Sequence, residues 1–314
     1  MRQYIIRRFL LIIPVILIVT FLVYSLLLLL PGDPAVALLG EDPDPTILER
    51  IREDLGLDRP IHVQYFEWLS RVFRGDLGHS IQTGESVTEA LKSRFPVTLQ
   101  IGLTALIISL VVSIPVGILS GAKRNSFGDN IAMILAYFGA AMPSFFLAII
   151  LMLIFSVKLG WLPPAGFTAP GDDLWQSVKS TLMPALALGL GGTAVLIRQI
   201  RSSMLEELAQ DYVRTARAKG LSEFAVLTRH ALRNGLMPVV TVLGVQIGYL
   251  LGGAVIVETI FAVPGMGRLA VSAFFQRDLP MAQGVVLVTA AVMLASNFIV
   301  DISYRYLDPR IQYR

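Results

Sequence analysis

The residues of this 314-residue chain that could do chemistry are few, and their spacing matches no common catalytic site. The sequence has no cysteine, which excludes disulfides, thiolate catalysis and cysteine-ligated metals. His62, His79 and His230 are far apart and lack the spacing of metal ligands. The sequence contains no G-x-x-x-x-G-K-[ST] nucleotide loop, no H-E-x-x-H zinc motif and no G-x-S-x-G nucleophile motif. We therefore predict that the chain is not an enzyme and binds no metal or cofactor itself.

The composition is that of a protein built for a lipid bilayer. Hydrophobic residues make up 54% of the chain and charged residues only 16%, whereas a soluble domain carries about 25% charged residues. The net charge is only +3, and no basic stripe is interleaved with aromatic residues, so we do not expect nucleic acid as a partner.

Long uncharged stretches alternate with segments that hold the charges. A bilayer core of about 30 Å requires roughly 20 apolar residues in a helix. Six stretches approach or exceed that length: Phe9–Leu30, Val97–Ala122, Asn130–Val157, Thr181–Ile197, Met237–Val257 and Met281–Val300. We expect Pro115, Pro143 and Pro184 to kink or end spans without breaking them. The sequence predicts an all-α polytopic membrane protein, with residues 1–314 forming one transmembrane domain.

The first span has flanks that resemble a secretory signal peptide. Basic residues precede it, and Ala35-Val36-Ala37 has the form of a cleavage site. However, its apolar run of 22 residues is longer than the 7–15 that such signals use. We expect the span to be retained.

Lysine and arginine indicate the orientation, because cytoplasmic loops of membrane proteins are enriched in them. With six spans, the basic segments all fall on one side: three basic residues in Met1–Arg8, two at Lys123-Arg124, seven in Arg198–Leu236, and Arg305, Arg310 and Arg314 in the tail. The opposite side receives residues 31–96, with 12 acidic and seven basic residues. Both termini are therefore predicted to be cytoplasmic.

Residues 31–96 are expected to form a small extracytoplasmic insertion of three short helices resting on the membrane surface. The first would be capped by Asp44 and run from Pro45 to Gly56, the second from Pro60 to Gly75, and the third would follow a capping box at Ser86. Apolar residues recur along each helix: Ile47, Ile51 and Leu55 on one face of the first, Tyr65, Phe66, Leu69 and Phe73 along the amphipathic second, and Leu91 and Phe95 in the third.

Ionisable residues are missing from all six predicted spans. Glu258 and Asp301 lie just beyond the fifth and sixth spans, where we expect water at the membrane interface to solvate them. A proton- or ion-coupled transporter would be expected to need charged groups within its spans. Energy for any transport must therefore come from another component.

The basic segment 198–236 is expected to form two helices joined by a bend. Lys219-Gly220 is typical of a helix end, and Ser222 with Glu223 is typical of the next helix start. Each helix shows an apolar stripe: Met204, Leu208 and Tyr212 in the first, and Phe224, Leu227 and Ala231 in the second. Basic and small residues at the bend would suit close approach by a partner. From the residues alone, a specific docking surface and a plain loop both remain open.

The motifs of the chain, taken in order, resemble the dipeptide/oligopeptide/nickel permease family of ABC importers. The resemblance covers the whole chain and includes PGDP at Pro31–Pro34, GLDRP at Gly56–Pro60, GDLGHS at Gly75–Ser80, QDYVRTARAKGL at Gln210–Leu221, RHALRN at Arg229–Asn234, PVVT at Pro238–Thr241, ETIF at Glu258–Phe261, PGMGR at Pro264–Arg268 and DPRI at Asp308–Ile311. The long insertion after the first span resembles the first permease of a pair, as in dipeptide and glutathione systems.

The chain departs from the general pattern of binding-protein-dependent permeases, which is Glu-Ala-Ala followed by a glycine. Arg214-Thr215-Ala216 occupies the place of that triplet before Gly220, so only the last alanine matches. The distance from Gly220 to Pro238 is also longer than in the general pattern. Peptide-type permeases share both departures.

The resemblance implies the type I ABC importer permease fold in a bacterial inner membrane. It implies a coupling helix that docks on an ATPase subunit through Tyr212, Arg214, Thr215, Ala216, Arg217, Lys219, Gly220 and Leu221, and an outer loop or gate at Glu258, Phe261, Pro264, Gly265 and Gly267. The implied partners are a second homologous permease, two ATPase subunits that hold ATP and magnesium, an extracytoplasmic binding protein, and a di- or oligopeptide or glutathione as substrate.

Three alternatives remain beside a peptide permease. A nickel or small-solute permease of the same build would be expected to carry histidine or methionine clusters in its spans, and the methionines here are scattered. An intramembrane enzyme would need a nucleophile paired with a base. A membrane-anchored scaffold would not need six spans with prolines in them.

Overall fold

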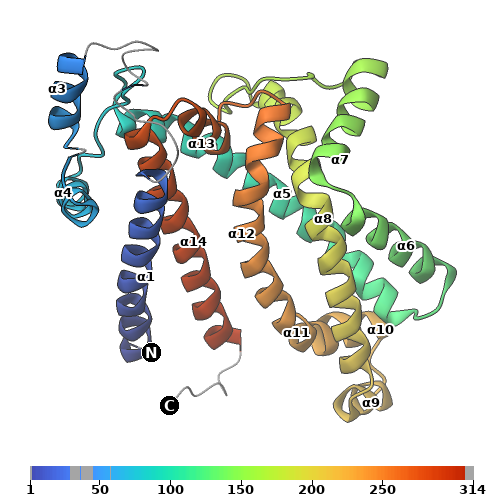
Figure 1. Cartoon of the computed structure of the whole chain (residues 1–314). Helices are drawn as coiled ribbons and strands as arrows, with labels where there is room; N and C mark the ends of the chain where they lie inside the picture. The colour runs from blue at the N-terminus through green and yellow to red at the C-terminus, as the bar shows by residue number, and fades with distance from the viewer. Residues whose placement is uncertain (1, 29–35, 37–44, 57, 308–314) are drawn as a thin grey trace. The chain divides into compact units, whose positions relative to one another are not determined.

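The computed structural model describes residues 2–28, 36, 45–56 and 58–307, and the described residues are predominantly helical (Figure 1). The elements are α1 (Arg2–Leu28), α3 (Pro45–Leu55), α4 (Ile61–Phe73), α5 (Val87–Ala122), α6 (Phe127–Ala141), α7 (Ser144–Leu151), the π-helix η1 (Met152–Lys158), α8 (Leu174–Leu208), α9 (Asp211–Ala218), α10 (Glu223–Ala225), the π-helix η2 (Val226–Ala231), α11 (Leu232–Gly235), α12 (Met237–Ile260), α13 (Met266–Phe275) and α14 (Leu279–Leu307). The predicted features at Pro31–Pro34, Asp44, Leu57 and Asp308–Ile311 lie outside the described residues.

The chain folds as two compact units. The first comprises Met1–Val97 and Pro264–Ala295, and the second comprises Thr98–Val263 and Ser296–Arg314. The basic segment 198–236 and the fifth predicted span both belong to the second unit.

Each predicted span has a helical counterpart. Among the described residues, α5, α8 and α14 are each long and apolar enough to cross a membrane, and two bent pairs raise that number to five. The bent pairs are α6 with α7 and η1, and the two halves of α12, which are inclined by 55°. The sixth counterpart is α1, whose 27 residues correspond to about 40 Å of helix.

The third span is broken, contrary to the prediction for Pro143. The chain turns by 106° between α6 and α7. Met142 and Pro143 are both extended, with ψ of 125° and 140°, because a residue that precedes proline is sterically disfavoured in the helical region. The predictions for the other two prolines are confirmed, since α5 and α8 continue through Pro115 and Pro184.

The prediction of a separate third helix in the insertion is wrong, because α5 starts directly after Ser86 and continues through Pro96 into the second span. Proline inside a helix costs about 3 kcal/mol. In the first unit this start of α5 packs through Val87 and Leu91 on Met281 and Val285 of α14. Burying each such side chain contributes about 1.5–3 kcal/mol, enough in sum to offset the proline.

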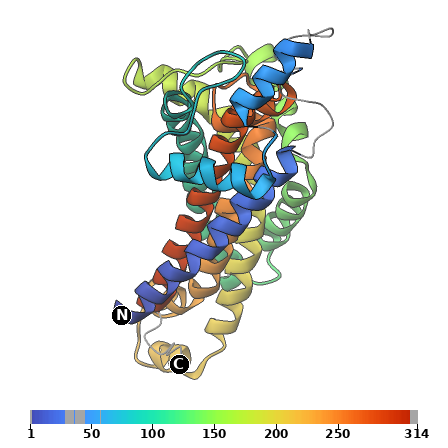
Figure 2. The same ribbon diagram turned by 60° about the vertical axis from the view of Figure 1, so that its left-hand side comes forward.

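The second helix of the insertion, α4, lies beside α1 (Figures 1 and 2). The two helices pack through a cluster of aromatic rings. Tyr65 and Trp68 are buried against Tyr24, and the Tyr65 hydroxyl donates to the Leu17 carbonyl at 3.0 Å. The predicted bounds of α3 and α4 are confirmed, including the helix ends at Gly56 and Gly75. Of the apolar residues predicted in α4, Tyr65 is buried, whereas Phe66 and Phe73 are 63% and 81% exposed.

In the second unit α8 is the central helix, packed against α6, α7 and α12 (Figure 1). The close approach of α5 to α8 requires glycine: a Cβ atom on Gly117 or Gly121 would lie 2.6 Å from the Cβ of Ile200 or Met204. Small residues spaced four apart bring membrane helices together in this way. The C-terminal end of α8 leads into α9, the first separate helix of the basic segment 198–236.

Candidate functional site

The basic segment 198–236 begins as the last turns of α8 and then changes direction. α8 ends at Leu208, and Gln210 takes an extended conformation before α9 starts. The predicted single stripe of Met204, Leu208 and Tyr212 is therefore wrong, because Tyr212 belongs to the separate helix α9. Asp211 in the first turn favours this start by its interaction with the helix dipole.

Gly220 forms the predicted bend at the end of α9. Its φ is +78°, in the left-handed region. The Gly220 N–H donates to the Arg217 carbonyl at 2.9 Å, and the Leu221 N–H donates to the Ala216 carbonyl at 3.4 Å. This pair of hydrogen bonds is the Schellman arrangement, which satisfies the last carbonyls of a helix. The prediction of a glycine bend is confirmed.

The helix after the bend starts where predicted but is wound differently. The Ser222 side chain accepts a hydrogen bond from the Ala225 N–H, which confirms the predicted cap. The next residues, Val226–Ala231, form the π-helix η2. A π-turn holds more residues than an α-turn, so the predicted face of Phe224, Leu227 and Ala231 is disrupted. Ala231 is buried, whereas Phe224 is 77% exposed.

A small apolar core holds α9 and the second helix together. Val213, Ala216 and Val226 are buried in it, with Leu208 packed alongside. Outside this core, the Arg217 guanidinium pairs with the Glu223 carboxylate across the bend, with Nε to Oε1 at 2.8 Å. We refer to residues 211–225 as the bend segment. Its shape is set by its own core and hydrogen bonds.

Tyr212 connects α9 to the end of α8 and to α11. Its hydroxyl donates to the Glu207 carboxylate and accepts from the Asn234 side-chain amide at 3.1 Å. Burial, and then the hydrogen bond to Glu207, raises the pKa of the Tyr212 hydroxyl. The phenol therefore stays protonated and remains a donor at neutral pH.

The surface of the bend segment contains most of the predicted interface residues. Arg214, Thr215, Arg217, Lys219, Gly220 and Leu221 are all exposed, as is Tyr212 in part. Ala216 is an exception, at 5% exposed, and contributes to the inner core. Sequence reasoning missed Phe224, which adds a large exposed ring close in sequence to Leu221. The sequence predicted only that Phe224 shares an apolar stripe with Leu227 and Ala231. Its position in the first turn, directly after the Ser222–Glu223 cap, could have indicated its exposure.

Glu258 is buried, contrary to the prediction that interfacial water solvates it. It is 0% exposed in α12, and the Thr98 hydroxyl donates to its Oε1 at 2.6 Å. Phe261, at the end of the same helix, is 1% exposed, and its carbonyl accepts from the Gly166 N–H at 2.8 Å. Both residues belong to the second unit.

The other three outer candidates belong to the first unit. Gly265 precedes α13 as its N-terminal cap residue, and Gly267 lies in its first turn and is buried. Pro264, half-buried, begins this part of the unit. The five candidates are therefore divided between two units.

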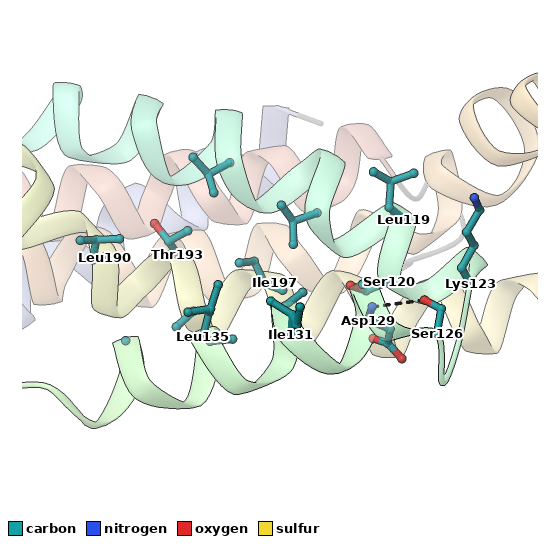
Figure 3. Close-up of a pocket in the computed structure, with 17 residues that line it drawn as sticks. Leu119, Ser120, Lys123, Ser126, Asp129, Ile131, Leu135, Leu190, Thr193 and Ile197 are labelled. Atoms are coloured by element: carbon teal, nitrogen blue, oxygen red, sulfur yellow. Dashed lines mark hydrogen bonds between the residues drawn. The ribbon is translucent and has the colours of Figure 1, made fainter.

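A cavity of about 690 Å³ lies among α5, α6 and α8 in the second unit (Figure 3). Its wall is mostly apolar, with residues such as Leu119, Ile131 and Leu135. Lys123, Ser126 and Asp129 gather at one end (Figure 3). The Asp129 carboxylate is buried and accepts two hydrogen bonds from Arg201, from Nε and Nη2, each at 2.7 Å. This ion pair ties the start of α6 to α8.

These elements together define a polytopic membrane transport subunit. Residues 113–313 match the family described as the binding-protein-dependent transport system inner membrane component, and residues 1–102 match the N-terminal family of such membrane components. The chain belongs to this family. It is a permease subunit of an ABC importer, and thus a transport subunit rather than an enzyme.

Two proteins with sequences similar to this chain have names that describe transport permeases. A protein of Brucella abortus (strain 2308), whose name assigns it to a peptide transport system as a permease protein, is 45% identical over 301 residues, which is 96% of each chain. The glutathione transport system permease protein GsiC of Salmonella choleraesuis (strain SC-B67) is 41% identical over 314 residues, the full length of both chains.

The fold is similar to that of the MetNI methionine ABC transporter in inward-facing conformations. One such structure has a TM-score of 0.57 at 14% sequence identity, covering 70% of this chain and 96% of the solved one. A second crystal form gives 0.58 at 15% identity. The predicted type I importer permease fold is confirmed.

Proposed function

We propose that this chain is the first permease of a pair in an importer for di- and oligopeptides, with glutathione within that class. Two full-length relatives with peptide and glutathione transport names support the substrate class. The observation that carries the mechanism is the exposed bend segment, because its Gly220 bend and inner core fix one shape for a partner to recognise.

In this proposal the bend segment docks on an ATPase subunit. Arg214 and Lys219 offer charge at its surface, and Leu221 and Phe224 offer apolar area. Exposed aromatic and arginine side chains of this kind supply much of the binding energy of interfaces. Two ATPase subunits would hold ATP and magnesium, and their closure would move the bend segment and α8, with which it is connected through Leu208 and Tyr212.

The remaining parts of the proposal concern the outer face and the pathway. A binding protein would deliver the peptide to the extracytoplasmic face of the importer. A second homologous permease would complete the pathway between its spans and those of this chain. Apolar side chains such as Leu103, Ile107 and Val111 on α5 are exposed, which suits either lipid or a neighbouring helix.

The function is tested by uptake into vesicles that contain the complete importer. With binding protein outside and ATP inside, we expect accumulation of radiolabelled alanine peptides of two to five residues. We expect hydrolysis of ATP only when the ATPase subunits are present, and no nucleotide binding by the purified chain. Accumulation of nickel ions in place of peptides would contradict the substrate class.

The orientation is tested by single cysteines on this cysteine-free chain. Thr83→Cys lies in the exposed turn before α5, and Arg124→Cys lies in the exposed turn between α5 and α6. We expect a membrane-impermeant maleimide to label Thr83→Cys on intact cells, and Arg124→Cys only after permeabilisation. Labelling of Arg124→Cys from outside would overturn the cytoplasmic placement of the bend segment.

A further inference from the structure

A group of polar side chains lies inside the second unit, between α5, α8 and α12. The Ser109 hydroxyl donates to the Gly189 carbonyl at 3.0 Å, and the Thr193 hydroxyl lies 3.0 Å from Ser109 Oγ. The Gln246 side-chain amide approaches the same oxygen, with Nε2 at 3.5 Å from Ser109 Oγ. Ser109, Thr193 and Gln246 are all buried.

The Gln246 amide has one end without a hydrogen-bond partner. Gln246 is 5% exposed, and within the part of the chain that the structure describes its Oε1 has no partner. A hydroxyl offers one hydrogen and two lone pairs. Ser109 donates to the Gly189 carbonyl, and Thr193 Oγ1 lies within hydrogen-bond distance of both Ser109 Oγ and that carbonyl, at 3.0 and 2.9 Å. The hydrogens of both hydroxyls are therefore used within this group and do not reach Gln246 Oε1. If the amide were rotated by 180°, Nε2 would lack a hydrogen-bond partner in place of Oε1.

The position of this amide requires a residue without a side chain at the facing position of α8, Gly192. A Cβ atom on Gly192 would lie 1.9 Å from Gln246 Nε2, so no other residue at position 192 leaves the amide where it is. A buried polar group that lacks a partner costs free energy, and such groups are rare in folded proteins. An amide that is held in this way suggests that its partner is supplied from outside the chain.

A pocket of about 300 Å³ adjoins the amide. Its lining residues come from the end of α6, from α8 and from α12: Ala140, Met142, Gly191, Gly192, Val195, Val242, Val245 and Gln246. Its volume is near the lower end of the range of small-molecule sites, about 300–1,000 Å³. The lining has no charged side chain and one amide. Such a wall fits a neutral segment that carries a hydrogen-bond donor.

We propose that this pocket, which we call the amide pocket, binds the transported peptide inside the membrane, and that Gln246 Oε1, which is closed to solvent in this structure, turns toward the pocket to accept a hydrogen bond from a backbone N–H. The apolar wall would contact the adjoining side chain, and selection by side-chain type would be weak because no charged group lines the pocket. This inference rests on the proposed peptide importer and adds the site that the peptide meets on its way through.

The first test replaces Gln246 by methionine, which keeps the volume and removes the amide. In vesicles with the complete importer, we expect the number of alanine peptides imported per ATP hydrolysed to fall about threefold to tenfold, the usual effect of one neutral hydrogen bond. The matched control is Gln199→Met on α8, since Gln199 Nε2 also lies 3.5 Å from a serine hydroxyl and Gln199 does not line the pocket. That variant should retain the wild-type ratio.

Thermal unfolding of the same complexes separates binding from structure. Since the Gln246 amide is only partly satisfied, Gln246→Met should unfold at the wild-type temperature or above it. A lower unfolding temperature together with lost transport would assign Gln246 a structural role and overturn the proposal. An unchanged import ratio would overturn it too. If the wild-type complex imports no alanine peptide, the proposed function itself fails.

A second measurement detects the peptide in the pocket directly. Val245 lines the pocket and is 73% exposed, so a cysteine there should react with a small methanethiosulfonate reagent. During turnover with loaded binding protein and ATP, we expect at least threefold slower labelling of Val245→Cys than with unloaded binding protein. Val157→Cys on η1, 70% exposed and outside the pocket, should show no such difference. Equal labelling of Val245→Cys in both conditions would contradict the proposal.

Discussion

Gly220→Val is expected to lower ATP-driven peptide uptake about 5- to 30-fold while leaving membrane insertion intact. Gly220 has a φ of +78°, and a Cβ atom there would meet nothing within 4 Å, so the change acts on the backbone alone. A side chain in the left-handed region costs about 1–2 kcal/mol, which corresponds to that factor in the equilibrium constant between the native bend and other conformations. The assay is uptake and ATP hydrolysis by the reconstituted importer at matched expression.

Two further variants test whether the loss of uptake depends on the position of the substituted glycine and on its backbone conformation. Gly160 also has positive φ, +64°, with open space around it, so Gly160→Val carries the same backbone cost at a site after η1 and should transport normally. Gly220→Asn should retain most uptake, because asparagine tolerates the left-handed region. If Gly220→Val transports like wild type, or if Gly160→Val is equally impaired, the bend segment is not the coupling element.

Asp129→Ala is expected to lower the free energy of unfolding more than Gly220→Val, Gln246→Met or Asp211→Ala. Removing the carboxylate leaves the partly buried Arg201 guanidinium without its partner, and breaking a buried pair in this way costs about 3–5 kcal/mol. Arg201 retains 22% exposure and can gain some water, so the value should lie near the lower limit. The Asn125 N–H also loses its acceptor, Asp129 Oδ2, at 2.9 Å. Thermal unfolding of the purified complex in detergent measures the effect.

The exposed pair of Asp211 and Arg214 provides the control. Their side chains are 95% and 73% exposed, so Asp211→Ala should cost no more than about 1 kcal/mol. The double variant Asp129→Ala/Arg201→Met should recover part of the lost stability, because it removes the unpaired charge as well. An equal effect of Asp129→Ala and Asp211→Ala would show that the ion pair does not hold α6 on α8.

Features with local causes were predictable from the sequence. The glycine bend at Gly220 and the cap at Ser222 follow from the conformations that these two residue types favour, and both are present. The six apolar stretches likewise predicted the helices, because their length is set by the bilayer.

Features that depend on tertiary packing were not predictable. Glu258 follows an apolar stretch and was expected to be solvated by water. In the structure it is buried, and its carboxylate accepts a hydrogen bond from the hydroxyl of Thr98, 160 residues earlier in the chain. Phe224 was assigned to one apolar stripe with Leu227 and Ala231, because a pattern of spacing cannot reveal the π-turns of η2. The break after Met142 was underestimated, since proline in a membrane helix is compatible with a kink or a break.

Photocrosslinking from Phe224 tests the central claim, that the bend segment docks on the ATPase subunits, most directly. A benzoylphenylalanine at position 224, which is 77% exposed, should yield an adduct with an ATPase subunit in the assembled importer. The same probe at Phe73 of α4, which is 81% exposed, is the matched control and should yield no such adduct. An ATPase adduct from position 73, or none from position 224, would contradict the account.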